Sequence, residues 1–408
     1  MTTRPRILYL PLEFTTWQDA QYWSYPMGLG LEEGFAENQF PWLTIPAWFG
    51  SPTTTPTQWL SRLQNLCAGE QFDQVWFTAN HLAFDDETLD ILSRLAPVRV
   101  GFFIESLVIS AEEWKRNPIA CQTREERAHR ALRLVTHATV FDEDDAHLLA
   151  ARGLPAMWWP GTTPRRFLCP EPVAPPAAAP AVFLGALYGE RAQWLAHPAL
   201  QGLLIRPNHS LEHETALPDF FNALQEEVAA YLTVTHLEYP AAAIYSVKRA
   251  GYGGAAPPPS LWQKPADNLR AALDQYLGQL REVRAHCFRL WLETLRRSAA
   301  VVNLPQFGWG FSGRVFETMA AGAPAIAHRI ANRPRSQTLF EDGREILLYS
   351  TPEELAEQIR RLQRDDAFRL ALLTRARACI AAHHTTGRRV AQCVHWLATG
   401  ELPRHGPR

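Results

Sequence analysis

The stretch from residue 308 to residue 328 constrains the fold of this chain more than any other part of it. An apolar run at residues 299–304, predicted to be a buried strand, leads into a glycine-rich turn and a short helix, and a second apolar run at residues 323–327 follows at once. A glycine-rich turn between a strand and a helix presents backbone N–H groups beside the positive end of the helix dipole. The stretch therefore predicts an anion-binding turn inside an α/β domain.

The predicted helix after this turn has two different faces. Its apolar face consists of Val315, Phe316, Met319 and Ala320. Arg314 and Glu317 lie together on the opposite face, one turn apart. A cation and a carboxylate beside an anion-binding turn suit a ligand with both phosphate and hydroxyl groups, such as a nucleotide sugar. The turn would bind this ligand through Gly310, Ser312 and Gly313, and Ser312 also stands where a helix N-cap is expected.

The same turn also matches the G-x-G-x-x-G fingerprint of dinucleotide-binding proteins, which would make the chain an NAD(P)-dependent oxidoreductase. Three features oppose this alternative. The helix is expected to end at Gly322, about nine residues after it begins, and the motif lies late in the chain rather than in an opening βαβ unit. No Asp or Glu follows about twenty residues on to hold a ribose, because His328 and Arg329 stand there instead.

The sequence around this turn resembles that of a known family. Residues 317–326 are similar to the E-x-M-A-x-G-x-P-x-I block of GT-B glycosyltransferases, and the surrounding text resembles their spore-maturation-protein-like branch. The other matching pieces are residues 182–191, 302–305, 313–317, 339–343 and 345–349, and His384 and Thr385 with Arg388. The likeness covers residues 180–400 well and the first 170 more loosely. It implies a GT-B fold, with two Rossmann-like doubly wound α/β domains facing a central cleft, and the transfer of a sugar from a nucleotide-sugar donor to an acceptor that it does not identify.

The resemblance also implies roles for the candidate donor-binding residues. Glu317 would accept hydrogen bonds from the ribose, although a carboxylate there also suits the helix dipole or an ion pair with Arg314. Arg314 would contact the diphosphate, unless it is a solvated surface charge. Arg191, which follows a turn that contains Gly185, resembles a phosphate-side residue of the family. Lys248 would neutralise the leaving diphosphate, although basic residues of this kind are usually surface charges.

Catalysis by inversion needs a base, and the ends of parallel strands are where α/β sheets present functional side chains. Glu105 follows the apolar strand predicted at residues 98–104, and His81 follows the strand predicted at residues 75–78. Many retaining GT-B enzymes carry a second Glu about eight residues before the ribose Glu, and this chain has Trp309 there, which favours inversion. A non-catalytic relative that binds a nucleotide sugar or a glycan, as a partner or scaffold, is the alternative.

The order of predicted elements favours two α/β halves. Residues 1–168 would form the acceptor-side domain, residues 169–181 a Pro/Ala-rich linker, and residues 182–408 the nucleotide-sugar domain, with a last helix near 388–400 that crosses back. A polar-aromatic loop at residues 13–26 would contribute to acceptor binding. Strands are predicted at residues 6–11, 42–46, 75–78, 98–104 and 137–141, helices near 28–35, 56–68, 85–95 and 267–297, and helix starts at Ser110, Thr123 and Thr351.

Composition excludes several other classes of protein. The 408 residues exceed a usual single domain, and a net charge of −2 with 20% charged residues leaves no electrostatic footprint for nucleic acid. No apolar run approaches the roughly 18 residues of a membrane span, and the chain begins without a signal-peptide pattern. Six scattered cysteines without a C-x-x-C pair predict reduced thiols in the cytoplasm and no metal site. The expected protein is a metal-independent monomer or homodimer that needs no cofactor besides its donor substrate.

Overall fold

The computed structural model describes residues 4–11, 30–45, 56–79, 86–116, 118–172, 180–185, 187, 189–206, 269–306 and 309–405. Two compact units divide the chain. The first comprises residues 1–104, 122–139 and 224–289, and the second comprises residues 105–121, 140–223 and 290–408. The boundary expected at residues 169–181 stays a prediction. His81, Lys248, the aromatic loop at residues 13–26 and most of the expected linker lie outside the described residues.

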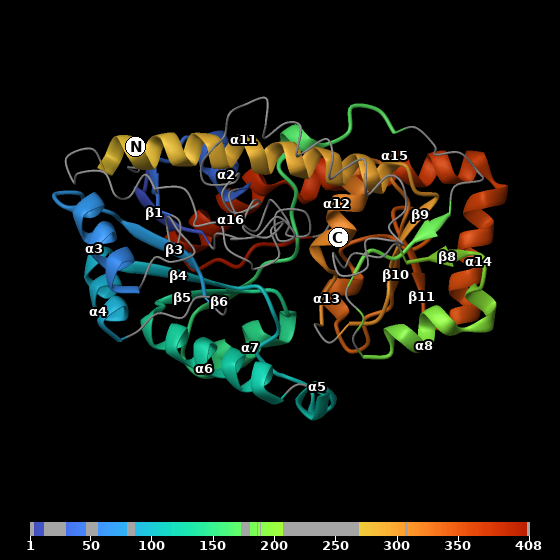
Figure 1. Ribbon diagram of the computed structural model, residues 1–408, viewed down its shortest axis with the longest axis horizontal. Helices are drawn as coiled ribbons and strands as arrows, with labels where there is room; N and C mark the ends of the chain where they lie inside the picture. The colour runs from blue at the N-terminus through green and yellow to red at the C-terminus, as the bar shows by residue number, and fades with distance from the viewer. Residues whose placement is uncertain are drawn as a thin grey trace, which may run out of the picture. The chain divides into compact units, whose positions relative to one another are not determined.

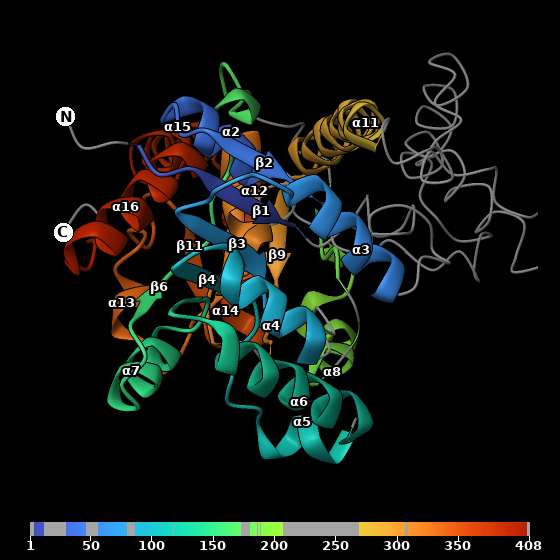
Figure 2. The same ribbon diagram turned by 90° about the vertical axis from the view of Figure 1, so that its left-hand side faces the viewer.

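The first sheet has six strands in the order β2-β1-β3-β4-β5-β6. They are β1 (Ile7–Leu10), β2 (Trp42–Thr44), β3 (Gln74–Thr78), β4 (Val98–Phe103), β5 (His137–Val140) and β6 (Ala156–Trp158). The pairs β1–β2, β1–β3 and β3–β4 are parallel, and Figure 2 shows these four strands side by side. All residues of β1 and β3 are buried, which explains why β1 is a continuous apolar run and why the three central residues of β3 are apolar rather than alternating.

The helices that follow along the chain are α2 (Gly30–Glu37), α3 (Pro56–Cys67), α4 (Asp86–Leu95), α5 (Ala111–Arg116) and α6 (Pro118–Leu134), of which α5 belongs to the second unit. The start expected at Ser110 is confirmed, because the Glu113 N–H donates to its hydroxyl at 3.1 Å and α5 follows. The start expected at Thr123 is wrong. α6 already begins at Pro118, since proline has no N–H to leave unpaired in a first turn, and Thr123 lies inside the helix.

The core of the first unit is aromatic around Phe35 of α2. Its ring packs edge-on against Tyr9 and Trp76, with centroid separations of 5.5 and 5.2 Å. A buried carboxylate lies in the same helix, since Glu32 is only 4% exposed. Arg281 of the long helix α11 (Leu269–Arg296) donates two hydrogen bonds to it, at 2.7 and 2.8 Å. Such a bidentate pair offsets much of the cost of burying the charge.

The second sheet has five strands in the order β11-β10-β9-β7-β8, and the neighbouring pairs in that order are parallel. The strands are β7 (Ala181–Val182), β8 (Leu204–Ile205), β9 (Ala300–Asn303), β10 (Ala325–His328) and β11 (Leu347–Tyr349) (Figure 1). The helices of this unit are α7 (Glu143–Ala151), α8 (Arg191–Ala196), α12 (Gly313–Ala321), α13 (Pro334–Gln337), α14 (Pro352–Arg364), α15 (Asp366–His383) and α16 (Thr386–Thr399). The short 3-10 turns are η2 (Arg165–Phe167) and η3 (Pro198–Leu200).

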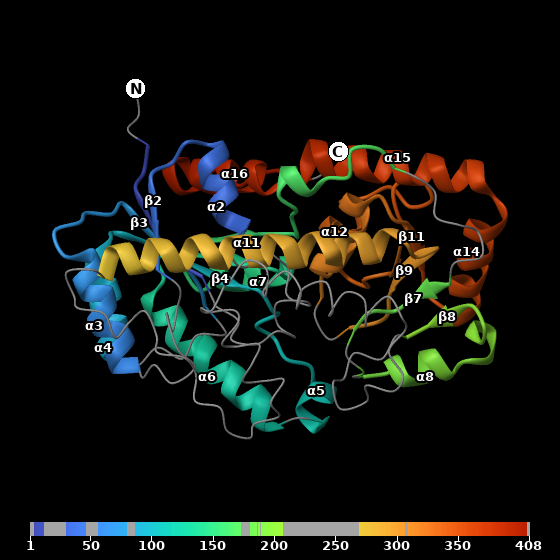
Figure 3. The same ribbon diagram turned by 45° about the horizontal axis from the view of Figure 1, so that its top comes forward.

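Helices α8 and α14 pack beside this sheet (Figure 3). Trp194 of α8 and Leu355 and Ile359 of α14 share one buried cluster with the strand residues Val302, Ile326 and Leu347. Two parallel sheets, each with helices, confirm the predicted α/β fold class. None of the described helices is long and apolar enough to cross a membrane.

Candidate functional site

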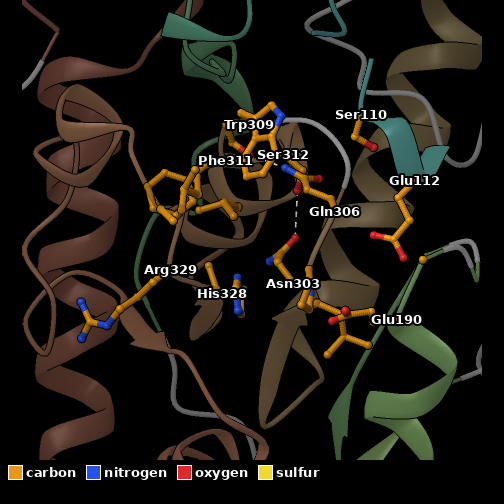
Figure 4. A pocket seen from close by; sticks show the side chains of 18 residues that line it. Ser110, Glu112, Glu190, Asn303, Gln306, Trp309, Phe311, Ser312, His328 and Arg329 are labelled. Atoms are coloured by element: carbon orange, nitrogen blue, oxygen red, sulfur yellow. Dashed lines mark hydrogen bonds between the residues drawn. The ribbon is translucent and has the colours of Figure 1, made fainter. Parts of the chain in front are cut away.

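A cavity of about 250 Å³ opens in the second unit, where β9 and β10 end (Figure 4). It is lined by Ser110, Glu112, Gly189, Glu190, Asn303, Leu304, Pro305, Gln306, Trp309, Gly310, Phe311, Ser312, Val315, Ala327, His328, Arg329, Ile330 and Ala331. The carboxyl ends of parallel strands are where α/β sheets bind their ligands. The glycine-rich turn that dominates the sequence therefore lies at the usual ligand edge of its sheet.

The start of α12 faces this cavity without a side-chain cap. Ser312 occupies the N-cap position, as predicted, but its side chain makes no cap hydrogen bond. Its hydroxyl donates instead to Asn303 Oδ1 at 2.9 Å, the bond drawn in Figure 4. The first N–H groups of an α-helix have no partner inside the helix. The Ser312 hydroxyl therefore does not cap the helix, although the Val315 N–H donates to the Ser312 carbonyl oxygen at 2.9 Å. A helix start without a side-chain cap suits an anionic ligand.

The glycine-rich turn is held close to its surroundings. The Gln306 side chain donates to the carbonyl oxygen of Gly310, which closes the turn. A Cβ added to Gly310 would lie 2.7 Å from an atom of the Phe141 ring. Glycine is therefore needed at residue 310 for close packing. Gly313, the first residue of α12, follows three positions later.

The pattern of apolar residues in its helix predicts that Glu317 faces solvent, but Glu317 is buried. It is 3% exposed, and Trp291 Nε1 of α11 donates to its Oε2 at 2.8 Å. The end of α11 covers that side of α12, which no local pattern in α12 encodes. Glu317 is not among the described residues that line the cavity. Its role toward the ribose stays a prediction.

Arg314 and Gly185 lie next to each other in the second unit. The Arg314 guanidinium lies over the Trp291 ring at 5.9 Å. A Cβ on Gly185 would lie 3.3 Å from Arg314 Nη1 and 2.9 Å from the Phe183 ring. A side chain at residue 185 would therefore press mainly on the Phe183 ring and would shift Arg314 only slightly. Neither residue belongs to the part of the described chain that lines the cavity, so their contacts with the donor stay predictions.

Arg191 is a buried residue that hydrogen-bonds to the wall of the cavity without lining it. It is 5% exposed, and its Nε donates to the carbonyl oxygen of Pro305 at 2.7 Å. Its guanidinium also lies 5.3 Å from the centre of the Phe183 ring. Pro305 lines the cavity, as do Gly189 and Glu190 just before Arg191. Arg191 thus joins two segments of the wall, while its predicted contact with phosphate stays a prediction.

Glu105 follows the end of β4, as expected, and is half-buried. The cavity is not lined by this residue among those described, and its role as a base stays a prediction. The neighbouring Ser106 has a contact that the sequence did not indicate. Its hydroxyl accepts a hydrogen bond from the Trp309 N–H at 3.2 Å and donates to Asp142 Oδ2 at 3.2 Å.

Asp142 and Arg333 form a bidentate ion pair next to the cavity-lining residue Trp309, and the sequence analysis predicted neither. Arg333 Nε and Nη2 donate to the two oxygens of Asp142, at 2.6 and 3.0 Å. Arg333 also reaches Asp144, at 2.7 Å, and lies 5.3 Å from the centre of the Trp309 ring. The available signal was the acidic run at residues 142–145, directly after a buried strand.

Two other carboxylates of that run, Glu143 and Asp145, accept hydrogen bonds from other backbone segments. Glu143 accepts hydrogen bonds from the N–H groups of Arg335 and Ser336, at 3.0 and 2.5 Å, at the start of α13. Asp145 accepts the Leu107 N–H at 2.7 Å. Burial raises the pKa of Asp145 to about 7, although the Leu107 N–H opposes this rise. The start of α7 therefore binds both the segment near residue 107 and the segment near residue 335.

His328 and Arg329 differ in what they offer the cavity. Burial lowers the pKa of His328, against the opposing effect of Glu190, so its ring is neutral at pH 7. That ring packs edge-on against Trp194 and Tyr349. Arg329 forms an ion pair with Asp342 and points away from the other labelled side chains in Figure 4. Among the described residues, no group of three or more His, Cys, Asp or Glu could hold a metal ion.

The part of the chain that carries the cavity and the start of α12 matches a known family. Residues 288–395 match the glycosyl transferase-like family model. This segment includes β9, the turn, α12 and β10, so the predicted resemblance to glycosyltransferases is confirmed over the part that carries the cavity. The narrower spore-maturation-protein-like branch stays a prediction. None of the curated proteins matches the chain.

Three solved structures to which the chain is similar span nearly its whole length. The Anabaena HepE complex with UDP-glucose shows 11% identity and a TM-score of 0.48, covering 97% of this chain and 100% of that one. A glycosyltransferase from Rickettsia africae shows 10% identity and a TM-score of 0.49, covering 96% and 97%. A mutant of T4 phage BGT in complex with UDP-glucose shows 12% identity and a TM-score of 0.47, covering 98% of each chain.

Proposed function

We propose that this chain is a glycosyltransferase that binds a nucleotide-sugar donor in the cavity of its second unit. One observation carries the proposal. The start of α12 faces the cavity, and the Ser312 side chain is hydrogen-bonded to Asn303 rather than to the helix N–H groups. The diphosphate of the donor would accept hydrogen bonds from these N–H groups. The match of residues 288–395 to the glycosyl transferase-like family supports this assignment.

The chemistry needed is stabilisation of a leaving diphosphate. Cleavage of the anomeric C–O bond leaves negative charge on the diphosphate, and an oriented helix start stabilises that charge without a metal ion. Arg314 is proposed to contact the diphosphate, Glu317 to accept a ribose hydroxyl, and Arg191, Lys248 and the glycines of the turn to support the phosphate side. The sugar is proposed to pass with inversion to an acceptor hydroxyl that Glu105 deprotonates, with His81 as the alternative base.

The wider setting of the reaction is part of the same proposal. We expect a cytoplasmic protein, monomeric or homodimeric, that uses no cofactor besides its donor.

A panel of UDP, GDP, dTDP, CDP and ADP in a thermal-shift assay would identify the nucleobase. A ligand that binds only the folded state stabilises it by about 2.7 kcal/mol at a hundredfold excess over its dissociation constant. Hydrolysis of the matching donor without an acceptor would distinguish an enzyme from a nucleotide-sugar-binding scaffold.

The anion site at the start of α12 is tested by replacing Ser312 with Asp. Aspartate is as good an N-cap as serine, but its carboxylate cannot donate to Asn303 Oδ1 as the Ser312 hydroxyl does. The gain of a cap and the loss of this hydrogen bond oppose each other, so the free energy of unfolding is expected to change little. Its carboxylate would compete with the donor for the helix N–H groups and repel the diphosphate. Two charges about 4 Å apart interact by roughly 1 to 4 kcal/mol in water or near a protein surface. We therefore expect the affinity for the nucleoside diphosphate, measured by calorimetry, to fall by at least about fivefold.

Ser312→Asn is the matched control, because asparagine has the same shape as aspartate but carries no charge. It is expected to keep most of the affinity. Thr351→Asp places the same charge at the N-cap of α14, in a different part of the unit, and should leave binding unchanged. Equal binding by the Ser312→Asp and Ser312→Asn proteins would contradict a diphosphate at this helix start. Stabilisation by NAD(P), with none by the nucleoside diphosphates, would contradict the proposed function itself.

A further inference from the structure

We propose that the ion pair of Arg333 with Asp142 positions Trp309 as a rigid wall of the cavity, against which a ring of the bound donor stacks. This inference rests on the proposed function, because it takes the occupant of the cavity to be a nucleotide sugar. Trp309 would contact the donor, whereas Arg333 and Asp142 would act through Trp309. Neither of these two is among the described residues that line the cavity.

The ion pair itself is rigid. Asp142 is fully buried and the Arg333 side chain is 11% exposed. Two parallel N–H···O contacts join them, at 2.6 and 3.0 Å. A bidentate guanidinium–carboxylate pair fixes both the distance and the plane of the two groups. The third contact of Arg333, to Asp144 at 2.7 Å, restrains the same guanidinium further.

Two separate contacts connect this pair to Trp309. The guanidinium of Arg333 lies 5.3 Å from the centre of the indole ring, within the range of a cation–π interaction. The backbone of Trp309 is held as well, because its N–H donates to Ser106 Oγ and the same hydroxyl donates to Asp142 Oδ2, both at 3.2 Å. Asp142 thus restrains the ring of Trp309 through Arg333 and its backbone through Ser106.

The position of Trp309 makes this restraint useful for binding. Trp309 lines the cavity only three residues before the uncapped N-cap position at Ser312, where the diphosphate is proposed to bind (Figure 4). A nucleotide sugar carries the transferred sugar on one side of its diphosphate and the ribose with its base on the other, so the sugar and the base are the two candidate rings. An indole held in place before binding offers either ring a large apolar face and loses little entropy when the ligand arrives.

The first experiment needs no ligand. Trp309 emission is isolated by subtracting the fluorescence of a Trp309→Phe protein from that of the intact protein, and its quenching by acrylamide is measured. Arg333→Met keeps an apolar stem and removes the guanidinium, so Trp309 is expected to become more accessible to acrylamide. Ser106→Ala, a smaller change, should do the same if Arg333→Met does not fold. The matched control is Arg344→Met, which removes an exposed ion pair with Glu341. Unchanged quenching in Arg333→Met and Ser106→Ala would overturn the positioning role.

The second experiment is a double-mutant cycle with UDP and UDP-glucose as probes. Arg333→Met is expected to weaken binding about tenfold when Trp309 is present, the loss that corresponds to about 1.4 kcal/mol. In a Trp309→Leu background the same change should cost less than about twofold, because its effect passes through the indole. Equal losses in the two backgrounds would mean that Arg333 acts through general stability, and would overturn the proposal.

The two probes distinguish which ring stacks. Coupling seen with UDP assigns the stacked ring to the base, and coupling seen only with UDP-glucose assigns it to the sugar. Both results support the proposal, and coupling with neither probe, where the wild-type protein binds them, overturns it. If the wild-type protein binds no nucleotide in the panel, the proposed function fails, and the quenching experiment still decides whether Arg333 and Asp142 position Trp309.

Discussion

Lowering the pH from 7 to 5 is expected to destabilise the protein through two buried histidines, His384 and His405. They are 0% and 5% exposed. Arg389, which is fully buried, donates Nη2–H to His384 Nδ1 at 3.2 Å and Nη1–H to His405 Nδ1. His405 Nε2–H donates to the carbonyl oxygen of Trp158 at 2.7 Å. An imidazole nitrogen that accepts a hydrogen bond carries no proton, so both rings are neutral in the folded protein.

The sign of the pH effect follows from the direction of these pKa shifts. Burial, and then the charge of Arg389, lowers the pKa of both histidines in the folded state. Burial lowers the pKa of Arg389 itself to about 9, so it stays protonated between pH 5 and 7. The unfolded chain binds protons at these histidines below about pH 6.5, and the folded chain does not. Stability is therefore complete above pH 6.5 and falls, for each histidine, by about 1.4 kcal/mol per pH unit below it.

Asp145 acts in the opposite direction over the same interval. Because burial raises its pKa to about 7, the folded protein binds a proton there before the unfolded chain does. The slope of unfolding free energy against pH in the wild-type protein therefore mixes these contributions. The difference in slope between a variant and the wild-type protein measures the contribution of one residue more directly. Urea unfolding at pH 7, 6 and 5 should show a flatter dependence in His384→Asn and in His405→Asn, each by about 1.4 kcal/mol per pH unit. Asp145→Asn should make the dependence steeper.

His395→Asn is the control for this series, because His395 is an exposed histidine at the protein surface, with 61% of its side chain accessible. It is expected to leave the slope as it is in the wild-type protein. Slopes that do not change in either of the buried-histidine variants would mean that these rings take up protons at the same pH in the folded protein as in the unfolded chain. That outcome would contradict the acceptor role of both Nδ1 atoms toward Arg389.

Gly161→Ala is expected to destabilise the protein by roughly 3 kcal/mol, at the upper end of the usual cost of overpacking. A Cβ at residue 161 would come within 2.9 Å of three atoms of the Phe316 ring. Phe316 is fully buried and packs against Phe340 and His384, with ring centres 5.3 and 5.4 Å away. The ring therefore has no space into which it can move. The measurement is the midpoint of urea unfolding at constant pH.

The control for this clash is its relief by a smaller residue at position 316. Phe316→Leu alone should lower stability, because it removes buried apolar surface. In the Gly161→Ala/Phe316→Leu double variant the loss of unfolding free energy should be much smaller than the sum of the two single-variant losses, since leucine leaves room for the new methyl group. Additive losses would show that the clash with Phe316 is not what makes residue 161 a glycine.

The sequence by itself determined the elements whose signals are local. Continuous apolar runs predicted the buried strands, because both faces of a parallel sheet are covered by other elements. Thr351 is the N-cap of α14, as its Pro and Glu neighbours indicate, and it accepts the Glu354 N–H at 3.2 Å. The glycine-rich turn and the short helix after it were also predicted, and α12 ends at Gly322, which has a φ of 73° that favours glycine.

Only the tertiary structure decided which faces of these elements are covered and which distant side chains meet. Glu317 has the spacing of an exposed residue, yet the end of α11 covers it and Trp291 donates to it. Asp142 and Arg333 look like ordinary surface charges along the chain, and their burial as a pair beside Trp309 depends on segments far apart in the sequence. Periodicity records the relation of a residue to its neighbours within one element. Burial and pairing depend on contacts between elements, which a local pattern does not contain.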